Sequence, residues 1–234
     1  MRFKKDENPW RSEKSVGGNQ ERSLEPQPFW GYEDIGIFLL LTVVLGLIVR
    51  LLVRSQFLTR SSMDNPSVAL QSAVVTLLGA GFYFVIRLRY RQPVLKPLGW
   101  IVPQTPYIVI ALMAGPSFAA GIALYLRLRN QVCPPIPINE VLILGLVLGP
   151  ILEESFFRGC LMPLLAQSMG SIPAIIIAAA IFAIFHGPTN LGHCLTFTAT
   201  GIAYGWVRMA SGSTTAPALM HAAYNLTFGL LAGA

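Results

Sequence analysis

The sequence has 234 residues, of which 53% are hydrophobic and 12% are charged. A mean hydropathy of +0.58 excludes an ordinary soluble domain, in which about 25% of residues are charged. The formal net charge of +6 does not indicate nucleic-acid binding, because the basic residues lie at segment ends and in loops, as they do beside membrane helices.

Seven stretches of the sequence are apolar enough and long enough to cross, or nearly cross, a lipid bilayer. They are Ile35–Val53, Ser67–Ile86, Pro106–Leu126, Val141–Leu165, Ile172–Phe185, Leu191–Val207 and Thr214–Ala232. We therefore predict an all-α, polytopic membrane protein with about seven transmembrane helices and its site between the last four.

The chain divides into three parts by composition. Residues 1–30 are polar and rich in Glu, Ser, Gln and Pro, which predicts a disordered cytoplasmic arm. Residues 31–140 are interpreted as a three-helix membrane scaffold, and residues 141–234 hold the polar groups that are predicted to be buried. Basic residues in the arm and in the loop after the second stretch favour a cytoplasmic (inner) membrane location with the N-terminus inside.

Two adjacent glutamates, Glu153 and Glu154, are the only acidic residues from Val141 to the C-terminus. An acidic or basic side chain at the centre of a bilayer costs about 2.5 kcal/mol or more and is usually functional. Glu154 and Arg158 are four residues apart, so they share a helical face and can pair. Glu153 is rotated by about 100° from Glu154 and has no partner in its own helix, which suits a general base. The alternative is that both glutamates only hold helices together.

A histidine, His186, ends the stretch Ile172–Phe185, and Gly187 follows it as a helix stop. Residues 169–171 predict the turn before this stretch, and Glu153 lies about as far before that turn as His186 lies after it. In an antiparallel helix pair, Glu153 and His186 would therefore lie at the same depth. A lone histidine at a helix end is more often a cap, but the matching depth favours a site.

The last stretch contains His221 and Asn225, which are four residues apart and share a helical face. Both side chains offer hydrogen-bond donors of the kind that a tetrahedral oxyanion requires. Ordinary hydrogen bonding between helices is the alternative. We expect both residues to converge with Glu153 and His186 on one cavity, with His221 within about two helical turns (~11 Å) of the Glu153 carboxylate.

Together these motifs resemble the CPBP family of intramembrane proteases, which includes the CAAX prenyl endopeptidases and the bacteriocin-processing or self-immunity (Abi) proteins. The family's pattern is EExxxR, then FxxxH, then HxxxN or a similar third motif. Here the motifs run from Glu153 to Arg158, from Phe182 to His186 and from His221 to Asn225. The resemblance covers residues 141–228, and the first three stretches match only as generic membrane helices.

The resemblance implies an endopeptidase that hydrolyses a peptide bond in a polar chamber opening to the cytoplasm. Glu153 and His186 would activate water, His221 and Asn225 would stabilise the oxyanion, and Glu154 with Arg158 would form a supporting pair. The expected partners are a peptide or membrane-protein substrate and the lipid bilayer. One divalent metal such as zinc, held by Glu153, His186 and His221, and catalysis without a metal both fit these residues.

Two other functions stay open at this point. One is a catalytically silent CPBP-like membrane scaffold or bacteriocin self-immunity protein, although every motif residue is intact. The other is a carboxylate-dependent membrane transporter, which predicts an internal repeat that the sequence does not contain. The sequence does not identify the substrate, say whether it is prenylated, or indicate the oligomeric state.

Overall fold

The computed structural model describes residues 28–54, 66–91, 93–129, 141–188 and 190–232. In these residues the chain forms seven continuous helical segments and no strand, which confirms the all-α prediction. Residues 1–27 of the predicted arm lie outside the described part. The elements are α1 (Tyr32–Arg54), α2 (Pro66–Tyr90), α3 (Thr105–Leu128), η1 (Val141–Leu148), α5 (Gly149–Glu154), η2 (Ser155–Leu161), α6 (Met162–Met169), α7 (Ser171–Phe185), α8 (Leu191–Ser211) and α9 (Thr215–Ala232). Ten labels are used for the seven segments, because η1, α5, η2 and α6 are consecutive parts of one segment.

The fourth predicted stretch is one continuous helical path whose hydrogen-bonding pattern changes along its length. The π-helical segments η1 and η2 flank the short α5, and α6 completes the path. Glu153 and Glu154 are the last two residues of α5, and Arg158 lies in η2. Rare π turns inside α-helices frequently occur at functional sites. The sequence predicted the helix but not this change of helical geometry around the glutamates.

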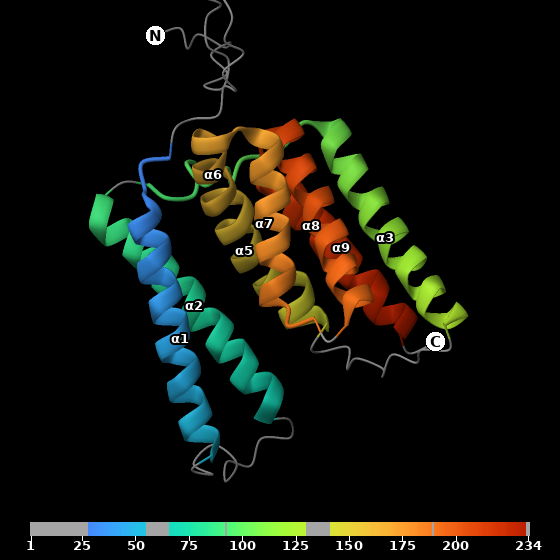
Figure 1. Cartoon of the computed structure of the whole chain (residues 1–234), viewed down its shortest axis with the longest axis horizontal. Helices are drawn as coiled ribbons and strands as arrows, with labels where there is room; N and C mark the ends of the chain where they lie inside the picture. Colours follow the sequence, from blue (N-terminus) through green and yellow to red (C-terminus); the bar gives the residue numbers. More distant parts are fainter. Residues whose placement is uncertain (1–27, 55–65, 92, 130–140, 189, 233–234) are drawn as a thin grey trace, which may run out of the picture.

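The helices pack in three groups, which Figure 1 shows from one side. The pair α1 and α2 lies at one flank, α3 lies at the other, and the elements from α5 to α9 lie between them. Residues of α3 with little or no side chain, including Gly115, are buried at intervals of four and face α9. A Cβ atom on Gly115 would collide with the backbone at Met220. This close approach explains how α3 supports the helix that carries His221.

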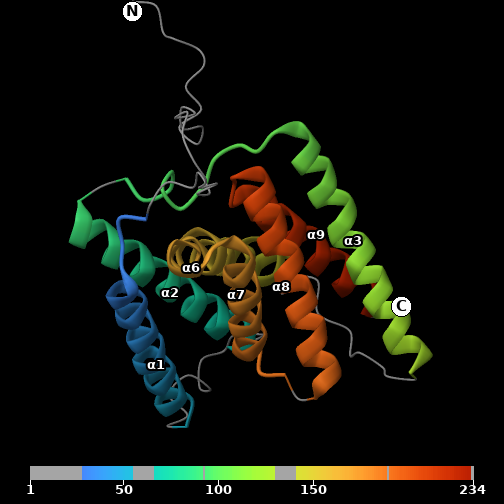
Figure 2. The same cartoon turned by 45° about the horizontal axis from the view of Figure 1, so that its top comes forward.

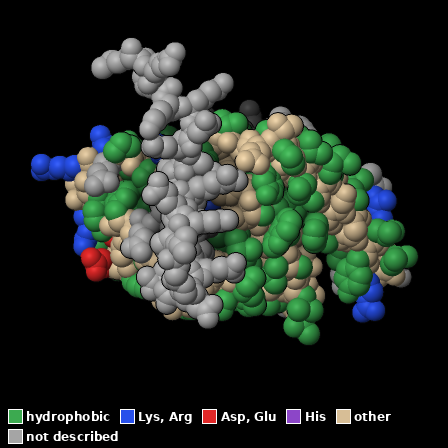
Figure 3. Space-filling model, turned by 90° about the horizontal axis from the view of Figure 1, so that it is seen from above, with side chains coloured by type: hydrophobic (Ala, Val, Ile, Leu, Met, Phe, Trp, Pro, Cys, Tyr) green, Lys and Arg blue, Asp and Glu red, His purple; other side chains and the backbone are tan. Residues whose placement is uncertain are grey.

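Much of the outer surface is apolar. Large hydrophobic side chains are exposed along α1, α2, α3 and α7, among them Leu40, Leu51, Leu88, Met113 and Ile184. Figure 3 shows apolar side chains spread over one such face. An apolar surface of this extent is typical of contact with lipid. Among the described helices, α3 is the one that is both long enough and apolar enough to cross a membrane by length and composition.

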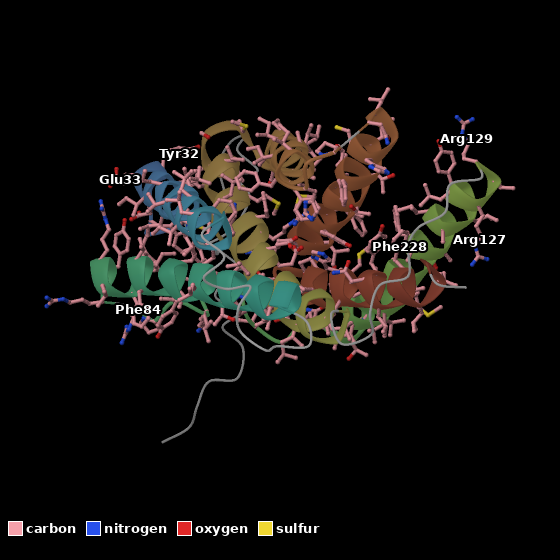
Figure 4. The ribbon with its side chains drawn as sticks, turned by 90° about the horizontal axis from the view of Figure 1, so that it is seen from below. Tyr32, Glu33, Phe84, Arg127, Arg129 and Phe228 are labelled. Atoms are coloured by element: carbon pink, nitrogen blue, oxygen red, sulfur yellow. The ribbon has the colours of Figure 1, made fainter. Side chains whose placement is uncertain are left out.

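The beginning of α1 is fastened to the helical path that carries the glutamates. The indole of Trp30 donates a hydrogen bond to the carbonyl of Cys160, and the Tyr32 hydroxyl lies 3.1 Å from the Ser168 hydroxyl. We call this end of the bundle, where α1 begins and α6 ends, the arm end. Figure 4 shows Tyr32 and Glu33 on the opposite side of the molecule from Arg127 and Arg129.

Candidate functional site

Three of the four residues predicted to catalyse the reaction meet at one place. Oε2 of Glu153 lies 3.5 Å from Nε2 of His186 and 3.9 Å from Nε2 of His221. The expected limit of two helical turns between Glu153 and His221 is therefore met with a wide margin. The side chains of Glu153 and His186 are 31% and 25% exposed, although Oε2 of Glu153 is itself buried.

The arrangement of three helices explains why these side chains meet. The chain turns at Gly170, where φ is +86°, so α7 runs back alongside the path that holds Glu153. Phe185 ends α7, which leaves His186 at the depth of Glu153. His221 lies closer to the start of its helix, but α9 is inclined to α7 and α8 (Figure 2), and Nε2 of His221 lies 3.9 Å from Oε2 of Glu153.

The second glutamate, Glu154, belongs to a buried hydrogen-bond network, called the dry network, whose other members are Arg158, His221 and the Gly201 carbonyl. Its Oε1 accepts one hydrogen bond from Nη1 of Arg158 at 3.0 Å and lies 2.9 Å from Nδ1 of His221. Arg158 donates a further bond from Nη2 to the carbonyl of Gly201 at 2.9 Å. The side chains of Glu154 and Arg158 are 0% and 1% exposed. The expected Glu154–Arg158 pair is present, and Glu154 also contacts a site histidine, which the sequence did not indicate.

The contacts of the two histidines define which ring nitrogen faces Glu153. Nδ1 of His186 lies 2.8 Å from the carbonyl of Phe182, and a carbonyl can only accept a hydrogen bond. Nδ1 of His186 therefore donates to this carbonyl, and Nε2 is the ring nitrogen that faces Glu153. The Glu154 carboxylate has the same effect on Nδ1 of His221. Both Nε2 atoms are directed at Glu153.

The fourth predicted residue, Asn225, makes a different contact. Its side-chain N–H donates to the carbonyl of Gly145 in η1 at 2.8 Å, which ties α9 to the start of the fourth stretch. This is the interhelical hydrogen bond that the alternative interpretation described. His193 lies exposed in the first turn of α8, where its backbone N–H is capped by Asn190.

The helix α8, to which the sequence analysis assigned no site residue, also lines the site. The ring of Phe197 stacks on His186, the ring of Tyr204 stacks on His221, and Gly201 accepts the bond from Arg158. A signal was present in the sequence, because Gly201 and Gly205 form a GxxxG pattern, which marks close helix packing in membranes.

The polar atoms around Glu153 suit a water molecule. Among the described residues, the buried Oε2 of Glu153 accepts no hydrogen bond, although two Nε2 atoms face it. In the described part of the chain, no group of three or more His, Cys, Asp or Glu side chains is placed to hold a metal ion. The steps proposed below are written for the side chains and a water molecule.

Fold and site together define a class: an all-helical membrane protein with a Glu–His–His cluster between its last four helices. Residues 135–227 match the family model described as Type II CAAX prenyl endopeptidase Rce1-like. All three motifs, from Glu153 to Asn225, lie inside this match. This match supports the resemblance to the CPBP family of intramembrane proteases. No curated protein and no solved structure gives a significant match to the chain.

Proposed function

We propose that this protein is an intramembrane endopeptidase in which Glu153 and His186 activate the water that attacks a peptide bond. The observation that carries the proposal is the short distance from Oε2 of Glu153 to the Nε2 atoms of two histidines, in a pair that is partly exposed. A carboxylate and an imidazole at this separation are the usual parts of a general acid–base site.

In the first step, water enters between Glu153 and His186 and donates hydrogen bonds to both. Glu153 accepts the proton as the water oxygen bonds to the substrate carbonyl carbon. The carbonyl π electrons move to its oxygen, which becomes the oxyanion of a tetrahedral intermediate. His186 keeps the water oriented, because its Nδ1 proton is committed to the Phe182 carbonyl. General-base assistance of this kind contributes about 10²–10⁴-fold to a rate.

In the second step, the oxyanion is stabilised and the peptide C–N bond breaks. Nδ1–H of His221 is held by the Glu154 carboxylate, and a proton on Nε2 would let the same ring donate to the oxyanion. Asn225 would add its second amide N–H, since Gly145 uses one. The electron pair of the oxyanion reforms the carbonyl, and the leaving amine takes the proton that Glu153 received.

We also propose that all seven helical segments cross the bilayer and that the site opens on the side opposite to the arm end. Tyr32 and Ser168 fasten α1 to the arm end, where α7 also begins one residue beyond Gly170. The 15 residues of α7 span about 22 Å. His186 therefore lies about 22 Å from the arm end. On this proposed topology, a cytoplasmic arm would place the mouth of the site on the other side of the membrane.

The proposal is tested by measuring peptide cleavage with the purified protein in detergent. Two matched peptide series, one farnesylated at a CAAX cysteine and one unmodified, are compared for wild type, Glu153→Ala and His186→Ala. Wild type should cleave at least one series, and both variants should be inactive. The matched controls are Glu33→Gln, which removes an exposed carboxylate on α1, and His193→Ala, which removes an exposed histidine on α8.

Each outcome decides between the functions. Cleavage that is lost in both site variants and kept in both controls supports the endopeptidase. A folded wild type that cleaves neither series rejects the endopeptidase in favour of a silent scaffold. Cleavage by wild type that a chelator abolishes and zinc restores would overturn the metal-free mechanism while keeping the activity.

A further inference from the structure

We propose that α8, which carries none of the predicted catalytic residues, orients both site histidines through the rings of Phe197 and Tyr204. Its effect on hydrolysis rests on the proposed function, whereas its effect on the histidine rings does not. Phe197 and Tyr204 would be positioning residues, which act on the substrate only through His186 and His221.

The two aromatic side chains hold the histidines in the same way. The Phe197 ring stacks on the His186 ring with centroids 4.5 Å apart and an interplanar angle of 30°. The Tyr204 ring stacks on the His221 ring at 4.9 Å and 21°. Phe197 and Tyr204 are seven residues apart, which is about two helical turns, so both rings project from one face of α8. One helix face therefore supplies a platform to each histidine.

A stacked aromatic ring restricts the plane of a histidine ring, which a single hydrogen bond leaves free to rotate. His186 and His221 are each held at Nδ1, by the Phe182 carbonyl and the Glu154 carboxylate. A bond at one ring atom fixes that atom but allows the ring plane to swing around it. A flat aromatic neighbour at stacking distance restricts the plane as well. With both constraints, Nε2 of each histidine points at Glu153.

Close packing of α8 on α7 brings the rings of Phe197 and Tyr204 within stacking distance of the two site histidines. A Cβ atom on Gly201 would lie 3.0 Å from the backbone of Ala179, and one on Gly205 would lie 3.0 Å from Ile175. These two glycines thus allow the helices to approach closely. Arg158 also donates to the Gly201 carbonyl, so the same turn of α8 joins the dry network to the platform.

The chain offers a direct test because it contains three histidines. With isotope-labelled histidine, magnetic resonance reports the shifts and tautomers of His186, His193 and His221 separately in the full chain. His193 is exposed in the first turn of α8 and serves as an internal reference. The variants are Tyr204→Leu and Phe197→Leu, which remove a ring, and Tyr204→Phe and Phe197→Tyr, which keep it.

We expect each ring removal to act on its own histidine. Tyr204→Leu should change the ring shifts of His221 and mix its tautomers while leaving His186 unchanged, and Phe197→Leu should do the reverse. Tyr204→Phe and Phe197→Tyr should restore the wild-type signals. Trp206→Leu, which removes an exposed ring from the same helix, should change neither site histidine.

In the peptide assay, each ring removal should lower kcat/KM about tenfold to 10²-fold, mainly through kcat, because misplaced reacting groups cost that much. The ring-keeping variants should retain activity. Equal disturbance of both histidines by either leucine variant, or no disturbance by both, would overturn the platform. Selective magnetic-resonance changes in a protein that cleaves no peptide would keep the platform and reject the endopeptidase.

Discussion

The two adjacent glutamates occupy regions of opposite character. Glu154 is 0% exposed, and its Oε1 contacts both Arg158 and His221. Glu153 is 31% exposed, and its buried Oε2 accepts no hydrogen bond from any described residue. The first arrangement pairs a buried charge and holds side chains in place, whereas the second leaves an oxygen without a hydrogen-bond partner among the described residues. Partners and side-chain exposure, rather than residue type, separate the two proposed roles.

The largest expected effect comes from Glu153→Gln. The substitution keeps the size of the side chain but removes the base, so cleavage should fall by at least about 10²-fold. Stability should change by no more than about 0.5 kcal/mol, because no buried partner is lost. Cleavage rate and thermal unfolding in one detergent measure the two quantities. A large drop in unfolding temperature would mean that Glu153 is as structural as Glu154.

The reverse pattern is expected for Glu154→Gln. This change leaves the buried Arg158 guanidinium without its counter-charge, which should destabilise the protein by about 3–5 kcal/mol. Denaturant unfolding in mixed micelles measures the loss. The double variant Glu154→Leu with Arg158→Leu removes both charges and should recover much of it. If the double variant is less stable than Glu154→Gln, the ion pair is a net stabilising interaction.

His221 contacts both glutamates, so its removal should lower both the cleavage rate and the stability of the protein. The loss of stability should lie between those expected for the two glutamate variants. His221→Ala deletes the Nδ1 contact with Glu154 and the Nε2 group beside Glu153. Cleavage should fall by about 10²–10³-fold, as for loss of an oxyanion donor, and stability by about 1–3 kcal/mol. His186→Ala is the comparison, and it should reduce cleavage with less loss of stability. Equal unfolding temperatures for the two variants would remove the distinction.

The smallest effect is expected for the stability of Asn225→Ala. Loss of its hydrogen bond to the Gly145 carbonyl should cost about 0.6 kcal/mol, the average for such bonds between membrane helices. The cleavage rate then separates two roles. A loss of about 10²-fold supports an oxyanion contact through the second N–H, whereas a change below about threefold, which is ~0.6 kcal/mol, assigns Asn225 to helix packing alone.

Local spacing predicted those features that depend on one helix or one turn. The four-residue spacing predicted the Glu154–Arg158 pair, and counting from the turn at Gly170 placed His186 beside Glu153. The contact of Glu154 with His221 spans 67 residues and depends on the inclination of α9. The stacking rings of α8 likewise depend on tertiary packing, which hydrophobic periodicity does not specify.

The number of predicted membrane spans also shows how far tertiary packing escapes a test based on one helix at a time. Each predicted stretch corresponds to a helical segment, yet α3 is the described helix that meets a simple test of length and composition for crossing a membrane. The apolar α7 has 15 residues, and α8 and α9 contain polar residues that the fold buries, such as Arg208 and His221. A buried polar group lowers the hydropathy of a helix without exposing that group to lipid.

On the proposed topology, the position of His186 at the far end of α7 gives the protein a sidedness. In sealed vesicles, a tag on the arm and the mouth of the site would lie in different compartments. Vesicles whose tag is removed by an external protease should therefore be the population that does not cleave a peptide added outside. A membrane-anchored substrate would meet the site only from the leaflet opposite to the arm. On this topology, the length of one short helix would select which leaflet can supply the substrate.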